Sequence, residues 1–146
     1  MRVLIESVGA DVVFRATGEG SGQTIVVDAR HGDGVVPEGP RPMELLAMGL
    51  GGCLVDNVVV ILKKKRVPFI GVRMDIEADR APESPKRFTA LRLRCVVEAE
   101  GLTQEALDKV LELAAKYCSA HATLTQGVPI TTVAAIEAPA SPAARP

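Results

Sequence analysis

The three cysteines, Cys53, Cys95 and Cys118, are the residues of this 146-residue chain with the widest range of chemistry. A thiolate can act as a nucleophile, form a disulfide or bind a metal ion. An odd number of cysteines in a chain of this length argues against a secreted scaffold held by disulfides. Free cysteines are also among the most buried residue types, so an inert position in the core is the alternative for each of them.

The alternation of residue types over 87–99 predicts a strand with Cys95 in the core. Its apolar face consists of Leu91, Leu93, Cys95 and Val97, whereas Arg92, Arg94 and Glu98 fall on the other face. Successive side chains of a strand point to opposite faces of the sheet. We therefore expect Cys95 to be a buried thiol without a chemical role.

Cys53 and Cys118 are predicted to lie on two helices, on the sides that face the interior. Cys53 lies within an apolar helix that begins at Pro42, a residue suited to the first helical position, and ends before Pro68. The second helix opens at Thr103, and its apolar stripe consists of Leu107, Val110, Leu111 and Ala114. The same spacing places Cys118 on the buried side, at or just beyond the end of the helix.

The elements that position these helices are predicted from turn residues and periodicity. They are strands over 3–8, 11–17, 23–28, 69–80, 87–99 and 129–137, and a short helix over 119–126. We expect a single α+β domain spanning residues 1–137 and a disordered Ala/Pro tail over residues 138–146. The chain is too small to surround a long apolar helix by itself, which predicts a homodimer with this helix in its core.

Charge and hydropathy exclude several classes of partner. The 17 basic and 18 acidic residues give a net charge of −1, so no nucleic-acid or anionic-membrane surface is expected. The apolar stretch over 45–62 is as long as a membrane span, but it contains Asp56, Asn57 and three glycines, and Asp at a bilayer centre costs about 3 kcal/mol. A buried central helix is expected instead. Glu6 lies too early for the apolar core of a signal peptide, which favours a cytoplasmic location.

Two runs of this sequence resemble motifs of the OsmC/Ohr family. The run Gly39-Pro-Arg-Pro-Met-Glu-Leu-Leu-Ala-Met-Gly-Leu-Gly-Gly-Cys53 is similar to the family's central helix, and the run Lys116-Tyr-Cys118-Ser-Ala-His-Ala-Thr-Leu124 is similar to its second-cysteine motif. The order of strands and helices over residues 1–137 matches as well. The resemblance implies an OsmC-like fold, with antiparallel sheets packed around a long buried central helix. It also implies an intertwined homodimer with its sites at the subunit interface.

The same resemblance implies a thiol-dependent peroxidase of the stress response. In that family the cysteine matching Cys53 attacks the O–O bond of an organic hydroperoxide and becomes a sulfenic acid. The cysteine matching Cys118 then resolves it as a disulfide, and a dithiol reductant reopens the disulfide, so no cofactor is needed. The alternative is a non-catalytic OsmC-like dimer that binds a small apolar ligand and has unreactive cysteines.

In the peroxidases of this family, an arginine paired with a glutamate holds the thiolate. This chain lacks a glutamate at the matching position. The residue at the matching position is Met43, and Glu44 stands one place later. Nine residues of a straight helix turn about 900°, which places Glu44 on the side opposite Cys53. We expect Glu44 to interact with the helix dipole in the first turn instead.

The family's activating arginine is missing as well. Its loop corresponds to residues 18–22, which contain no basic residue. Arg15, Arg30 and Arg41 remain as candidates. Cys53 lies mid-helix, so no helix N-terminus is expected to lower its pKa, and an ionised Asp56 one turn away would raise it. These departures predict a modest or absent peroxidase rate, typical of an OsmC-like branch.

A metal site is not expected. Cys118 and His121 have the spacing of a zinc-binding pair, but a site needs further ligands, and only His31 and Cys53 remain for that role. His121 is interpreted as a surface or packing residue, with a role as a base near Cys118 as the alternative.

Overall fold

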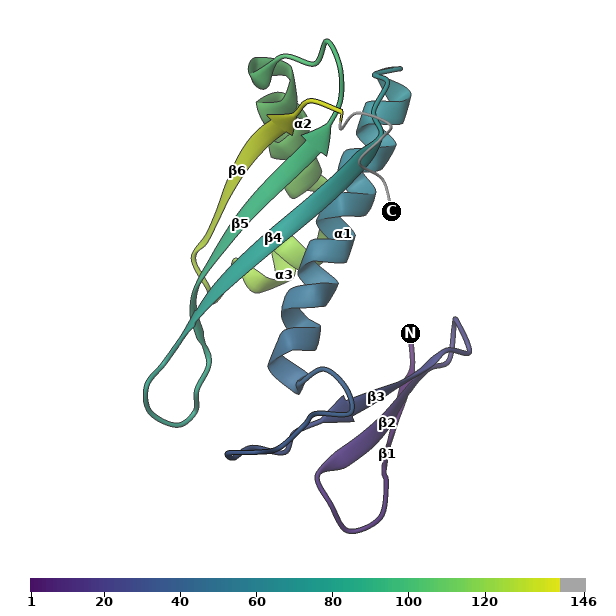
Figure 1. The fold of residues 1–146 in the computed structure, drawn as a ribbon, viewed down its shortest axis with the longest axis vertical. Coiled ribbons are helices and arrows are strands. Elements are labelled where there is room, and N and C mark those ends of the chain that lie inside the picture. The colour runs from purple at the N-terminus through teal and green to yellow at the C-terminus, as the bar shows by residue number, and fades with distance from the viewer. Residues whose placement is uncertain (140–146) are drawn as a thin grey trace. The chain divides into compact units, whose positions relative to one another are not determined.

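The computed structural model describes residues 1–139 and contains the helices and strands expected from the sequence (Figure 1). They follow in the order β1 (Val3–Ser7), β2 (Val13–Gly18), β3 (Thr24–Asp28), α1 (Pro42–Lys64), β4 (Gly71–Arg80), β5 (Phe88–Glu98), α2 (Gln104–Tyr117), α3 (Ser119–Leu124) and β6 (Ile130–Glu137). The chain divides into two compact units, one of residues 1–48 and one beginning at Gly49. The single domain over 1–137 stays a prediction, and most of the expected tail lies outside the described residues.

The first unit contains an antiparallel meander in the order β1-β2-β3. Its buried polar centre is Asp28, whose carboxylate accepts hydrogen bonds from the Arg30 guanidinium at 2.6 Å and from the backbone N–H of Glu38 at 2.9 Å. These donors hold the pKa of Asp28 well below its usual range. They also fix the loop between β3 and α1, because Glu38 is ten residues beyond Asp28.

The second unit contains a three-stranded sheet in the order β4-β5-β6. Strands β4 and β5 form the long antiparallel hairpin that the sequence predicts. Strand β6 lies at the edge, as expected for a strand that follows Pro129, but it pairs parallel to β5. The expectation of purely antiparallel sheets is therefore wrong for this pair. The reason is the connection, since α2 and α3 carry the chain back to the start of β5 and a crossover of this kind joins parallel strands.

The core of the second unit lies between this sheet and the helices, which lie behind the strands in Figure 1. Its buried members are Val58 and Leu62 of α1, Cys95 and Val97 of β5, Ala99, and Leu107, Val110, Leu111 and Ala114 of α2. A Cβ at Gly51 would lie 2.9 Å from Ile76 Cδ1, so this glycine allows α1 to approach β4 closely. The predicted apolar faces of β5 and α2 thus meet.

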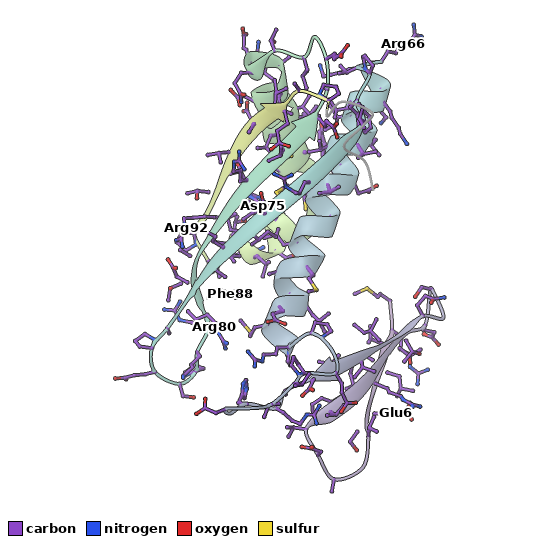
Figure 2. All side chains as sticks on the ribbon, in the orientation of Figure 1. Glu6, Arg66, Asp75, Arg80, Phe88 and Arg92 are labelled. Carbon is purple, nitrogen blue, oxygen red and sulfur yellow. The ribbon has the colours of Figure 1, made fainter. Side chains whose placement is uncertain are left out.

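The opposite face of the sheet carries charges that pair across the strands. Arg92 on β5 contacts Asp79 at 2.6 Å and Glu77 at 3.4 Å on β4, and Arg94 lies 3.8 Å from Asp75. Figure 2 labels Asp75 and Arg92 on these neighbouring strands. The side chains are about half exposed or more, so this is a solvated face with weakly stabilising ion pairs.

Helix α1 begins and ends as the sequence predicts, but one chain buries only part of it. Glu44 in the first turn accepts a hydrogen bond from the backbone N–H of Arg41 at 2.8 Å, half of a capping box. The helix is long and apolar enough to cross a membrane, with a hydropathy of 2.1. Only 28% of that stretch is buried, and Val60 is 38% exposed. Burial on all sides is not reached, because the sheet of one chain covers a single side.

Candidate active site

Cys53 and Cys118 meet inside the second unit, although 65 residues separate them in sequence. Cys53 lies on α1 between the fully buried Leu50 and Leu54, and its side chain is partly exposed. Cys118 is fully buried at the junction of α2 and α3, as the stripe of α2 predicts. It ends α2 and caps α3, whose His121 N–H donates to its sulfur at 3.3 Å.

The two sulfur atoms lie 2.8 Å apart. A disulfide bond is about 2.05 Å long, so the two free thiols need only a small approach to join. The thiol of Cys118 donates toward the sulfur of Cys53. In this arrangement Cys53 accepts the hydrogen bond, which favours negative charge on its sulfur over that of Cys118.

The pKa values of the two thiols shift in opposite directions. The pKa of Cys53 is lowered from its ordinary value by the Cys118 thiol first, then by the backbone N–H of Ala120 and by the hydroxyl and N–H of Ser119, against the effect of desolvation. The pKa of Cys118 is raised, first by burial and then by its hydrogen bond to Cys53. Of the two thiols, Cys53 is therefore the one that ionises more readily.

The expectation that no helix start lowers the pKa of Cys53 is therefore wrong. The N–H groups that do so belong to Ser119 and Ala120, at the start of α3 rather than on the helix of Cys53. The predicted short helix over 119–126 indicated that such N–H groups exist, because the first N–H groups of a helix have no partner within the helix. Sequence spacing could not show that they point at a residue 66 positions earlier.

Two further residues at the site were not singled out from the sequence. The hydroxyl of Ser119 lies 3.9 Å from the sulfur of Cys53. Asn57, one turn after Cys53, donates its side-chain N–H to the carbonyl of Ala114 at 3.4 Å. This bond joins α1 to α2 one turn along α1 from Cys53. Asp56 is exposed and is absent from the groups with the largest effects on the pKa of Cys53.

Within residues 1–139, none of the residues considered as the family's glutamate or arginine is a hydrogen-bond partner of Cys53. Glu44 caps the start of α1, as expected for a first-turn residue. Arg30 binds Asp28 and also contacts Glu38 at 2.8 Å. Arg15 lies exposed on β2, and the buried Nε of Arg41 has no hydrogen-bond partner. Of these residues, Arg30, in the loop before α1, therefore pairs with two carboxylates.

Cys95 lies where the strand periodicity predicts, fully buried in the core, and burial raises its pKa to about 11. Replacing Cys95 by alanine removes only the sulfur atom from that core. We expect a loss of about 1 kcal/mol in the free energy of unfolding, measured in urea, with unchanged reactivity of the other two cysteines. A folded variant that loses peroxide turnover would contradict this prediction.

Within residues 1–139, no group of three or more His, Cys, Asp and Glu side chains is placed to hold a metal ion. His121 contributes its backbone N–H to Cys118. Its interpretation as a surface or packing residue stays a prediction, with a role of its imidazole as a base as the alternative.

A shallow groove of about 270 Å³ runs between α1 and α2, beginning one turn from Cys53. Its lining is mostly apolar and consists of Asn57, Val60, Ile61, Lys64, Lys65, Leu113 and Tyr117. Asn57 follows Cys53 by one turn, and Tyr117 precedes Cys118 in the chain. The groove therefore begins about one helical turn from Cys53 and extends toward the end of α1, and neither cysteine lines it.

Known proteins are similar to this chain in sequence and in fold. The family of OsmC-like proteins matches residues 32–133. Protein YhfA of Escherichia coli strain K12 is 35% identical over 112 residues, which cover 76% of this chain and 81% of YhfA. An OsmC-like protein from Mycoplasma pneumoniae superposes with a TM-score of 0.78 at 18% identity, over 93% of this chain and 97% of the other. An organic hydroperoxide resistance protein from Elizabethkingia anophelis gives 0.73 at 13% identity, over 94% and 97%. The chain belongs to the family of OsmC-like proteins.

Proposed function

We propose that this protein is a thiol-dependent peroxidase that reduces organic hydroperoxides, with Cys53 as the nucleophile and Cys118 as the resolving cysteine. The observation that carries the proposal is the pair of sulfur atoms 2.8 Å apart whose pKa values shift in opposite directions. A reactive thiolate beside a second thiol is the arrangement of a reversible redox site. The name of the Elizabethkingia relative supports the choice of substrate.

The reaction follows from the positions of these groups. The Cys53 thiolate attacks one peroxide oxygen, the O–O bond breaks, and the alkoxide leaves with the bonding electrons and takes up a proton. The Ser119 hydroxyl, 3.9 Å from the sulfur, is placed to donate that proton and recovers one from water. Cys118 then loses its proton and attacks the sulfenic acid, releasing water and forming the disulfide. A dithiol reductant returns both thiols.

The apolar groove that begins one turn from Cys53 supports an organic substrate. Val60, Ile61 and Leu113 offer apolar contacts to an alkyl or aryl group, which hydrogen peroxide lacks. The test is peroxide consumption with dithiothreitol as the reductant, comparing cumene hydroperoxide with hydrogen peroxide. We expect a kcat/KM at least about tenfold higher for the organic peroxide, since burying a few methylene groups contributes about 0.8 kcal/mol each. Absence of turnover with both peroxides would favour the non-catalytic dimer that binds an apolar ligand.

Ser119 provides a prediction specific to this site. Replacing Ser119 by alanine removes a hydrogen bond that lowers the pKa of Cys53, so that pKa should rise toward its ordinary value. Alkylation by iodoacetamide reports the thiolate and should follow a titration curve displaced to higher pH, with a slower rate at pH 7. In the unchanged protein the rate falls as the pH drops through the lowered pKa. An unchanged curve in Ser119→Ala would contradict the role of this hydroxyl.

We also propose that the protein works as an intertwined cytoplasmic homodimer. Several large apolar side chains are exposed in the single chain, among them Ile5, Ile25, Leu46 and Met48. Exposed large apolar side chains on β1, β3 and α1 are expected at a subunit interface. Light scattering at micromolar concentration should give twice the mass of the chain. A monodisperse monomer would contradict this prediction.

A further inference from the structure

We propose that the reduced Cys53–Cys118 pair also reduces low-molecular-weight disulfides, a second activity that needs no peroxide. The Cys53 thiolate attacks one sulfur of the disulfide, the S–S bond breaks, and the other sulfur leaves as a thiolate with the bonding electrons. Cys118 then gives its proton to water and attacks the sulfur of Cys53, releasing the second small thiol. The substrate gains two electrons, and the Cys53–Cys118 disulfide that remains is reduced by a dithiol.

The different exposure of the two sulfur atoms fixes the direction of this exchange. Cys53 is partly exposed, whereas Cys118 is 0% exposed, so an incoming disulfide reaches Cys53. The mixed disulfide therefore forms on Cys53. Its protein-side sulfur then has the Cys118 sulfur as a neighbour, at 2.8 Å in the reduced state. The His121 N–H that donates to Cys118 stabilises this second thiolate as it forms.

The polar groups around Cys53 suit a thiolate leaving group. The groups that most lower its pKa are a thiol, a hydroxyl and two backbone N–H groups, and none of these is a cation. A peroxide leaves as a strongly basic alkoxide, which requires a proton in the transition state. A small thiol leaves as a stable thiolate, and a leaving group of lower pKa leaves faster. A disulfide therefore demands less of this site than a peroxide does.

The experiment uses the full-length reduced protein and bis(2-hydroxyethyl) disulfide, without oxygen or peroxide. We expect two equivalents of 2-mercaptoethanol per chain and a Cys53–Cys118 disulfide located by peptide mapping. Cys118→Ser should release one equivalent and keep the other half of the substrate bound to Cys53. Cys53→Ser should release none. Cys95→Ala, altered only in the core, should behave like the unchanged protein and serves as the matched control.

A comparison of the two substrates tests the argument from the leaving group. At a pH high enough to ionise Cys53 fully, Ser119→Ala should lose about tenfold in attack on cumene hydroperoxide, because general acid catalysis contributes at least this much. Its attack on the disulfide should fall less than threefold. Equal losses would overturn the argument. No release of 2-mercaptoethanol by the unchanged protein, or release that survives Cys53→Ser, would overturn the proposal, and cumene hydroperoxide turnover would still report separately on the peroxidase.

Discussion

Replacing Cys53 by serine is expected to abolish peroxide turnover, with a loss of at least about a thousandfold in kcat/KM, because the other thiol at the site, Cys118, is fully buried and its pKa is raised. Cys95 cannot substitute for Cys53 either, since it is fully buried and its pKa is raised to about 11. The measurement is the consumption of cumene hydroperoxide with dithiothreitol. Turnover that survives in Cys53→Ser would place the chemistry elsewhere.

Replacing Cys118 by serine is expected to separate attack from recycling. Cys53 keeps a backbone N–H from Ala120 and both groups of Ser119, so one attack on the peroxide remains. Without the second thiol, the sulfenic acid is oxidised further to sulfinic and sulfonic acid by excess peroxide. Mass spectrometry should find two or three added oxygen atoms on Cys53. A Cys118→Ser protein that turns over many equivalents without this damage would contradict the resolving role.

The largest expected effect on folding is at Gly39, in the loop before α1. A Cβ at this position would lie 2.2 Å from the carbonyl oxygen of Val26 and 2.8 Å from its carbonyl carbon. These are backbone atoms of β3, so relief requires a shift of the strand or the loop. We expect Gly39→Ala to lower the free energy of unfolding by about 3 kcal/mol, at the upper end of the cost of overpacking.

Gly20→Ala is the matched control for this prediction, because a Cβ at Gly20 meets no atom within 4 Å. It should change the free energy of unfolding by less than about 0.5 kcal/mol, as surface substitutions do. Urea unfolding of both variants gives the comparison. A Gly39→Ala protein as stable as Gly20→Ala would show that the loop does not lie against β3 in solution.

Local patterns predicted most of the secondary structure, because caps and periodicity depend on residues that are close together in the sequence. Thr103 caps α2 by accepting from the N–H of Ala106, as its residue type indicates. The alternation of β5 placed Cys95 in the core, and the first-turn position of Glu44 predicted its interaction at the start of α1. In each case the deciding contacts lie within one element or one turn of it.

The sequence could not predict relations between distant segments. The parallel pairing of β6 depends on the path of the chain through α2 and α3. The N–H groups of Ser119 and Ala120 act on Cys53 across more than 60 residues, and periodicity contains no information on that contact. Asn57 is a further case, since a polar residue on an apolar helix gave no sign of its bond to Ala114.

The central claim is that Cys53 and Cys118 form one redox pair, and a thiol count tests it most directly. The reduced protein is treated with one equivalent of cumene hydroperoxide, its remaining thiols are titrated under denaturing conditions, and its peptides are mapped. We expect the three free thiols to fall to one, which is Cys95, with a disulfide between Cys53 and Cys118. Three remaining thiols, or a loss of two thiols without that disulfide, would contradict the claim.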